Sequence, residues 1–129
     1  MRALAEACLA GAEDGSLSFP QILGALTEGG FDGYLVDYRR TTATYYAADG
    51  DSVDLTAHTT EGAVAARLDP EALGEAIREA QAGGPDYSYR GFCRKAKAAG
   101  CAGYLVSISG RRVLYFGRDA ATHVELFPS

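Results

Sequence analysis

The feature that most constrains the fold is an internal repeat with a spacing of 70 residues. The tetrapeptide Gly-Tyr-Leu-Val occurs at 33–36 and again at 103–106. Around it, residues 18–49 align without a gap with residues 88–119. Eight of these 32 aligned positions are identical, where ordinary composition would give roughly two. They are Ser18, Gly30, Gly33, Tyr34, Leu35, Val36, Tyr45 and Asp49. The sequence therefore predicts an internal duplication, with two copies of one unit.

Each unit is predicted to fold into two helices followed by three short strands. Serine N-caps at Ser18 and Ser88, glycine stops and the spacing of apolar residues support this assignment. The expected helices are residues 3–11, 19–28, 70–82 and 89–99, and the expected strands are residues 33–38, 44–46, 52–56, 103–108, 111–117 and 122–127. After one inserted residue the match resumes at a spacing of 71, which aligns 53–55 with 124–126.

A three-stranded meander cannot bury its apolar face alone, so the two units are expected to share one core. We predict an α+β fold in which helices pack on a mostly antiparallel sheet of about six strands, with pseudo-twofold symmetry. Residues 1–129 then form a single domain, with internal repeats at approximately 3–56 and 70–127. The connecting stretch 57–68 has no clear pattern, and its structure is left open.

Charge divides the chain unevenly. The net charge is −5, yet residues 1–86 carry 15 acidic and 5 basic side chains, whereas residues 87–118 carry seven basic ones and no acid. Arg90, Arg94 and Lys97 share one helix face, which predicts a basic surface. That surface could bind single-stranded nucleic acid or an anion, but the acidic chain as a whole favours pairing with acids of the first unit, of helix 70–82 or of a second subunit.

Candidate catalytic groups are few. Cys101, His123 and His58 are weak candidates, and Cys93 could join them in a Cys–His pair. Their scattered positions do not suit a metal site, and no cofactor-binding motif is present, so we expect neither metal nor cofactor. The alternative is that the thiols are small buried core residues. Three cysteines without CxxC spacing, and no signal or membrane segment, lead us to expect reduced thiols and a cytoplasmic protein.

Tyrosine is abundant in the predicted strands. Adjacent aromatic residues place a ring on both faces of a sheet, so the face without helices would carry exposed aromatic side chains. A large exposed patch of this kind usually marks a binding surface or a dimer interface, although tyrosine also tolerates a half-wet strand face. The expected binding surface comprises Tyr34, Tyr45, Tyr46, Tyr104, Tyr115, Arg111 and Arg112.

Residues across nearly the whole chain resemble a known family. They are Ser18-Phe19-Pro20, Ile22, Gly30, Tyr34, Val36-Asp37, Tyr45-Tyr46 and Gly50, followed by Phe92-Cys93, Ala99-Gly100-Cys101, Gly103-Tyr104, Gly110-Arg111, Tyr115-Phe116-Gly117 and His123-Val124-Glu125. The chain resembles the uncharacterised bacterial and phage family labelled "phage envelope protein", domain of unknown function 1398. The resemblance implies a small soluble α+β protein and supplies no activity and no catalytic residues.

Three functional hypotheses remain open. The leading one is a non-enzymatic binding or interaction module that forms a homodimer. A small enzyme that uses Cys101 or His123 in a tyrosine-lined cleft is the first alternative, and binding of single-stranded nucleic acid or an anion through the basic second unit is the other. A concave pocket joining Cys101 and His123 would favour the enzyme, and a flat aromatic sheet face would favour the module.

Overall fold

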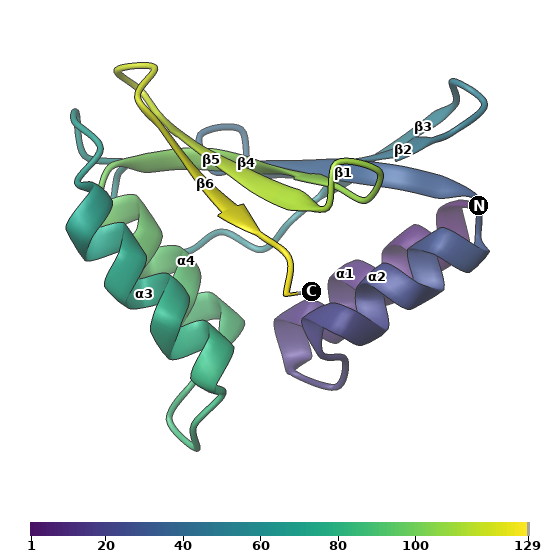
Figure 1. Ribbon diagram of the computed structural model, residues 1–129, viewed down its shortest axis with the longest axis horizontal. Helices are drawn as coiled ribbons and strands as arrows, with labels where there is room; N and C mark the ends of the chain where they lie inside the picture. The colour runs from purple at the N-terminus through teal and green to yellow at the C-terminus, as the bar shows by residue number, and fades with distance from the viewer. Residues whose placement is uncertain (129) are drawn as a thin grey trace.

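Residues 1–128, which the computed structural model describes, form four helices and one six-stranded sheet. The elements are α1 (Arg2–Asp14), α2 (Phe19–Glu28), β1 (Phe31–Asp37), β2 (Thr42–Ala47), β3 (Ser52–Thr56), α3 (Pro70–Ala82), α4 (Tyr89–Ala98), β4 (Cys101–Ser107), β5 (Arg112–Gly117) and β6 (Thr122–Leu126). The four helices lie on one face of the sheet, with α1 beside α2 and α3 beside α4 (Figure 1). The predicted α+β class is confirmed.

Three helices begin and end within one residue of their predicted bounds, whereas α1 continues to Asp14, three residues beyond its predicted end, and stops at Gly15 in the left-handed conformation. Ser18 accepts a hydrogen bond from the backbone N–H of Gln21, whose side chain bonds back to Ser18 and completes a capping box. Ser88 caps α4 in the same position. None of the helices formed by residues 1–128 is long and apolar enough to cross a membrane.

The sheet has the order β3-β2-β1-β4-β5-β6, and every neighbouring pair is antiparallel. At its centre Leu35 of β1 lies opposite Leu105 of β4. Every pairing between β1 and β2 recurs 70 residues later between β4 and β5, including the irregularity near Phe31 that recurs near Cys101. A twofold rotation about the Leu35–Leu105 pair would give this register, and the origin by duplication stays a prediction.

The glycine of each Gly-Tyr-Leu-Val segment is explained by the contact between the two units. A Cβ atom on Gly33 would lie 2.4 Å from the carbonyl oxygen of Val106, and one on Gly103 would lie 2.3 Å from that of Val36. Real Cβ atoms do not approach backbone that closely, so both positions need glycine for β1 and β4 to pair. The most recognisable feature of the sequence therefore encodes the centre of the sheet.

The last strand corrects one part of the sequence alignment. Tyr45 pairs with Val53 and Tyr115 pairs with His123, so the spacing of 70 continues through β6 and the predicted spacing of 71 is wrong. A shift of one residue exchanges the two faces of a strand. His123 and Glu125 therefore occupy the helix-facing places that Val53 and Leu55 hold in β3, and the apolar residues of β6 point to the other face.

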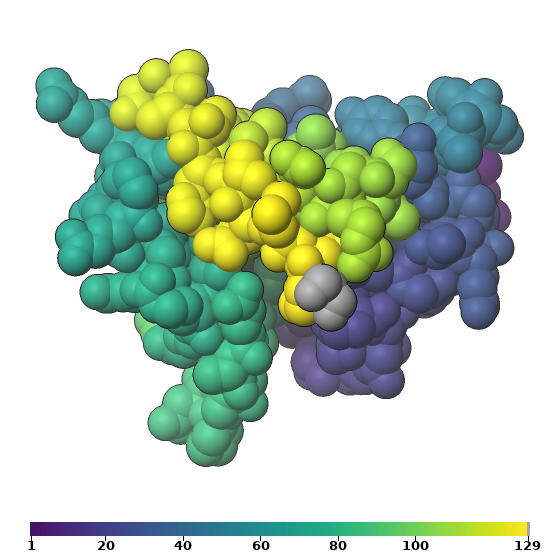
Figure 2. Space-filling view, viewed as in Figure 1, coloured from purple at the N-terminus to yellow at the C-terminus, as the bar shows by residue number. Residues whose placement is uncertain are grey.

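The two units also differ in what covers their helices. Residues 57–68, whose structure the sequence left open, cross beneath the sheet and lie against α4, where the N–H of Ala65 donates to the carbonyl oxygen of Lys97. In the first unit the matching place holds the C-terminal segment, where the ring of Phe127 packs against Phe19 at 5.7 Å. Figure 2 shows β6 and this segment on the surface between the two helix pairs.

Candidate functional site

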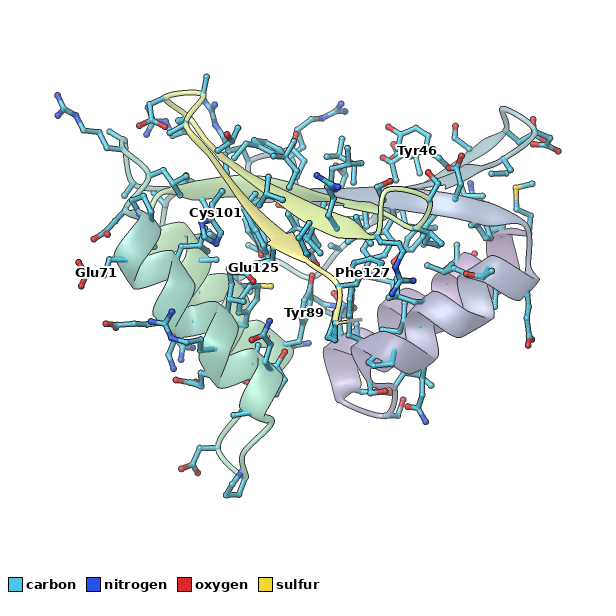
Figure 3. All side chains as sticks on the ribbon, in the orientation of Figure 1. Tyr46, Glu71, Tyr89, Cys101, Glu125 and Phe127 are labelled. Carbon is cyan, nitrogen blue, oxygen red and sulfur yellow. The ribbon has the colours of Figure 1, made fainter. Side chains whose placement is uncertain are left out.

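The predicted tyrosine surface requires correction. Tyr34, Tyr45, Tyr104 and Tyr115 are buried between the sheet and the helices, because their positions alternate onto the covered face. Only Tyr46 points away from the helices (Figure 3). The two arginines of the predicted surface make local contacts. Arg111 donates to the carbonyl oxygen of Pro128 and stacks on Phe127, and exposed Arg112 donates to the carbonyl oxygen of Gly110.

Cys101 and His123 do not share the open cleft that the enzyme hypothesis needs. Cys101 is fully buried, its Sγ lies 3.1 Å from the carbonyl oxygen of Gly103, and burial raises the pKa of the thiol to about 11. The Nε2 atom of His123 lies 2.9 Å from Oε1 of Glu125 at the edge strand. Neither side chain lines the polar pocket described next, so nothing activates this thiol as a nucleophile.

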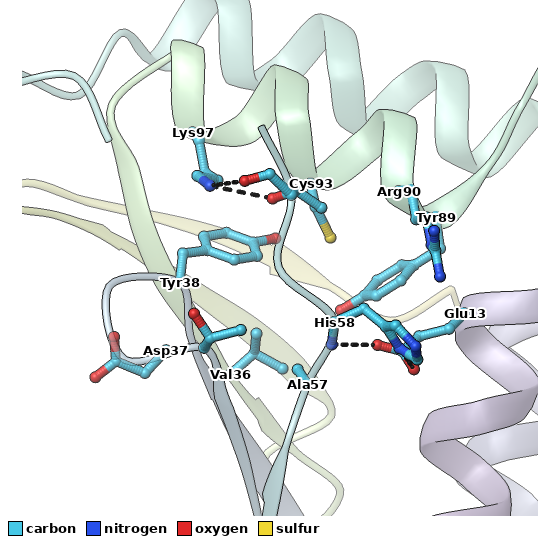
Figure 4. Close-up of a pocket in the computed structure, with 12 residues that line it drawn as sticks. Glu13, Val36, Asp37, Tyr38, Ala57, His58, Tyr89, Arg90, Cys93 and Lys97 are labelled. Carbon is cyan, nitrogen blue, oxygen red and sulfur yellow. Dashed lines mark hydrogen bonds and ion pairs between the residues drawn. The ribbon is translucent and has the colours of Figure 1, made fainter. Parts of the chain in front are cut away.

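The polar pocket lies where the end of β1, the last turn of α1, helix α4 and the segment after β3 meet (Figure 4). His58, a weak candidate from the sequence, is one of its lining residues. The Nδ1 atom of His58 lies 2.6 Å from Oε1 of Glu13, and the backbone N–H of His58 donates to Oε2 of the same carboxylate at 2.9 Å. These two contacts tie the crossing segment to the end of α1.

Lys97 enters this pocket instead of joining a basic surface. Arg90 and Arg94 are exposed, as predicted for a basic face, but Lys97 is only 6% exposed. Its Nζ atom donates to the carbonyl oxygen and the hydroxyl of Thr60, at 2.8 and 3.1 Å. Within residues 1–128, no carboxylate lies at ion-pair distance from this ammonium group.

Cys93 and Tyr38 complete the pocket, whose cavity of about 30 Å³ has room for one group the size of a water molecule. Burial raises the pKa of the Cys93 thiol, and the hydroxyls of Tyr38 and Tyr89 and the charge of Lys97 act in the opposite direction. The Tyr38 hydroxyl is buried beside the weakly polar Cys93 thiol, and among residues 1–128 it has no hydrogen-bond partner of good geometry. Burial also raises the pKa of Tyr38 well above its ordinary value, so this hydroxyl keeps its proton.

The equivalent place beside α2 has no such pocket chemistry. Seventy residues earlier or later, the places of Cys93, Lys97, Tyr38, Tyr89 and His58 are held by Leu23, Thr27, Ile108, Phe19 and Pro128. The fold therefore does not require polar groups there. Sequence reasoning missed Tyr38 and Tyr89 as residues that line one pocket with Cys93. The repeat alignment held a signal, which is a change from apolar to polar or titratable residues at matched positions.

A second candidate site is the sheet face that no helix covers. One row of directly paired residues crosses all six strands on this face: Asp54, Thr44, Leu35, Leu105, Leu114 and Val124. The first two are joined by a hydrogen bond of 2.8 Å, and the remaining four are apolar. Phe116 and Leu126 extend the apolar area beside this row. We call Leu35, Leu105, Leu114, Phe116, Val124 and Leu126 the open-face patch.

Most of the basic side chains in 87–118 have local partners. Lys95 pairs with Glu79 of α3 at 2.5 Å, and Arg118 donates to the carbonyl oxygen of Val64. Together with the contacts of Lys97, Arg111 and Arg112, these leave Arg90 and Arg94 as exposed cations for which the described residues show no partner. Most of the basic side chains of this stretch therefore make contacts within the fold itself.

Residues 1–128 contain no cluster of three or more His, Cys, Asp or Glu side chains that could hold a metal ion. A search of curated proteins found no match to the chain. A family profile described as "Protein of unknown function (DUF1398)" matches residues 8–125, which is most of the chain and includes the polar pocket and all of the open-face patch except Leu126. The phage association implied by the sequence resemblance stays a prediction, whereas the chain itself belongs to the DUF1398 family.

Proposed function

We propose that this protein is an interaction module that associates with a second copy of itself through the helix-free face of its sheet. The observation that carries the proposal is the unbroken apolar row Leu35–Leu105–Leu114–Val124. Leu105 is 37% exposed, Val124 44% and Leu126 64%, so the apolar surface is open to water. Contiguous exposed apolar area on a folded protein commonly marks an interface.

A second copy suits this surface because the row Leu35–Leu105–Leu114–Val124 contains no charged side chain, and the exposed Arg112 lies at its margin, opposite Leu126. In a twofold dimer the same patch lies against itself, so a charged patch would repel its copy and an apolar one can pack on it. The polar half of the same face, with Asp54 and Asp37, favours an arrangement in which the two apolar halves meet.

The size of the face sets the expected strength. Six strands about 4.8 Å apart, and five residues long at about 3.4 Å each, give a flat area of roughly 500 Å². A standard interface buries about 800 Å² of accessible surface per partner, so an interface formed by the apolar half of this face is smaller than the standard size. We therefore expect a dimer of modest affinity that dissociates on dilution.

Sedimentation equilibrium over a concentration series tests the proposal. We expect the wild-type protein to dimerise, Leu105→Glu to be monomeric with an unchanged melting temperature, and Thr56→Glu to dimerise normally. Thr56 is the matched control, because it is exposed on the polar half of the same face. A wild-type protein that stays monomeric at millimolar concentration, or equal dimerisation by Leu105→Glu, would overturn self-association.

A further inference from the structure

The polar pocket holds a positive charge that the protein does not neutralise. The Lys97 ammonium is buried against two neutral oxygens of Thr60, and a buried charge without a counter-charge is costly. The Cys93 thiol does not supply the counter-charge, because burial raises its pKa. A group from outside the chain can supply it.

The two carboxylates that line the pocket already accept hydrogen bonds from other parts of the chain. Both oxygens of Glu13 accept from His58, at 2.6 and 2.9 Å. Oδ1 of Asp37 accepts from the backbone N–H groups of Arg39 and Arg40, at 2.9 and 3.1 Å. The pocket also contains hydrogen-bond donors for which the described residues supply no acceptor of good geometry.

Two of these donors are the Tyr38 hydroxyl and the third proton of Lys97. An ammonium has three donors, and Thr60 accepts two of them. The Tyr38 hydroxyl is buried with only the Cys93 thiol, a weak partner, beside it and no hydrogen bond of good geometry among residues 1–128, although buried polar groups are nearly always paired. Both groups line the same cavity, which Figure 4 shows between α4 and the end of β1.

We infer that this pocket binds an oxyanion, with one oxygen in the cavity held by the Lys97 ammonium and the Tyr38 hydroxyl. The cavity of about 30 Å³ admits only one oxygen-sized group, so the rest of the ligand lies at the mouth. The exposed guanidinium of Arg90 lines that mouth and suits a second anionic oxygen. A carboxylate and a phosphate share this chemistry, and both are candidate ligands.

The first unit supports a ligand role over a structural one. At the equivalent place beside α2, Thr27 and Ile108 stand in the places of Lys97 and Tyr38, and the fold there is complete without an ammonium group or a tyrosine hydroxyl. A feature that one unit needs for folding alone would be expected in its counterpart.

Thermal unfolding in phosphate and in acetate, each compared with chloride at the same ionic strength, tests the inference. We expect one or both oxyanions to raise the melting temperature of the wild-type protein beyond chloride, because a ligand that binds only the folded state stabilises it. A response to phosphate alone or to acetate alone identifies the ligand class. Tyr38→Phe should weaken the apparent affinity about tenfold or more, and Lys97→Met should abolish the response. Lys95→Gln, on the exposed side of the same helix, should respond as wild type.

Two results would overturn the inference. One is the absence of any oxyanion-specific shift at anion concentrations up to about 100 times the Kd of a weak, millimolar site. At that concentration the stabilisation should reach about 2.7 kcal/mol, a hundredfold change in the folding equilibrium. The other is an equal shift in wild type and Tyr38→Phe. Tyr38→Phe keeps the ring and removes an unpaired hydroxyl, so it should fold even if Lys97→Met does not. Neither result bears on dimerisation, because the pocket lies on the helix side of the sheet.

Discussion

The two units pair their strands in the same register, but different segments cover their helices. Comparing them separates the features that strand pairing requires from those that depend on the covering segment. In the second unit, residues 57–68 lie against α4 and bury Lys97 and Cys93. In the first unit, the matching Thr27 is exposed and Leu23 is half-buried. The strand register within a unit is thus independent of the segment that covers its helices. The polar pocket exists only where residues 57–68 close it.

Replacing one glycine in each unit tests this difference most severely. Gly30 and Gly100 both have φ of 86°, a left-handed conformation that costs other residues about 1–2 kcal/mol. A Cβ atom on Gly100 would also lie 1.9 Å from the carbonyl oxygen of Arg67, whereas one on Gly30 meets nothing within 4 Å. We expect Gly100→Ala to lose more than about 3 kcal/mol and Gly30→Ala about 1–2 kcal/mol in urea unfolding. Equal losses would show that the crossing segment does not constrain the second unit.

Exchanging matched residues between the edge strands β3 and β6 should change the free energy of unfolding by unequal amounts in the two strands. Leu55 of β3 is buried on the side where α1 packs, and Glu125 holds the matching place in β6, where α3 makes no comparable contact within residues 1–128. Leu55→Glu should cost about 3 kcal/mol or more, because it buries an unpaired charge. Glu125→Leu should change the free energy of unfolding by less than about 1 kcal/mol. Guanidinium titrations of both variants measure the effects, and equal costs would contradict the difference in cover.

Alkaline pH should act on the second unit through Cys101, whose counterpart in the first unit is the non-titrating Phe31. Burial raises the thiol pKa from 9.0 to about 11, so the folded state holds the proton more tightly than the unfolded state. Stability from this group is complete below pH 9 and is lost as pH rises through 11, with a total of about 3 kcal/mol. Cys101→Ala should flatten the fall in unfolding free energy between pH 9 and 11. The buried tyrosines lie in both units and supply a remaining slope. An unchanged slope in the variant would exclude the thiol.

Backbone architecture was the part of this protein that the sequence predicted well. Serine caps, glycine stops and the Gly-Tyr-Leu-Val repeat are local signals, and each acts through its own hydrogen bond or close contact. The register of β6 failed because Val124 and Leu126 looked like the buried pair of β3, and hydrophobic matching cannot tell which face a helix covers. That choice depends on the helices and the turn before the strand.

The candidate sites were harder to predict, for a related reason. Alternation along a strand shows that Tyr34 and Leu35 face opposite ways, but not which of the two faces receives the helices. The polar pocket joins residues from α1, β1, α4 and the unpatterned stretch 57–68, which no local spacing brings together. Of the pocket residues, the sequence named His58, Cys93 and Lys97 separately, and only the fold places them around one cavity.

The smallest expected effect concerns the ion pair between the second unit's helices. Lys95 and Glu79 are each about half exposed. Ala25 holds the place of Lys95 in the first unit, and no ion pair joins α1 and α2 within residues 1–128. Exposed pairs contribute about 0–1 kcal/mol and weaken as salt screens them. A double-mutant cycle with Lys95→Gln and Glu79→Gln should therefore give a coupling energy below about 1 kcal/mol, smaller still at high salt. The melting temperature of the wild-type protein should then change little with added salt, because the other basic residues with assigned contacts bind neutral oxygens. A coupling above about 2 kcal/mol would mean that the second unit depends on its charges in a way that the first does not.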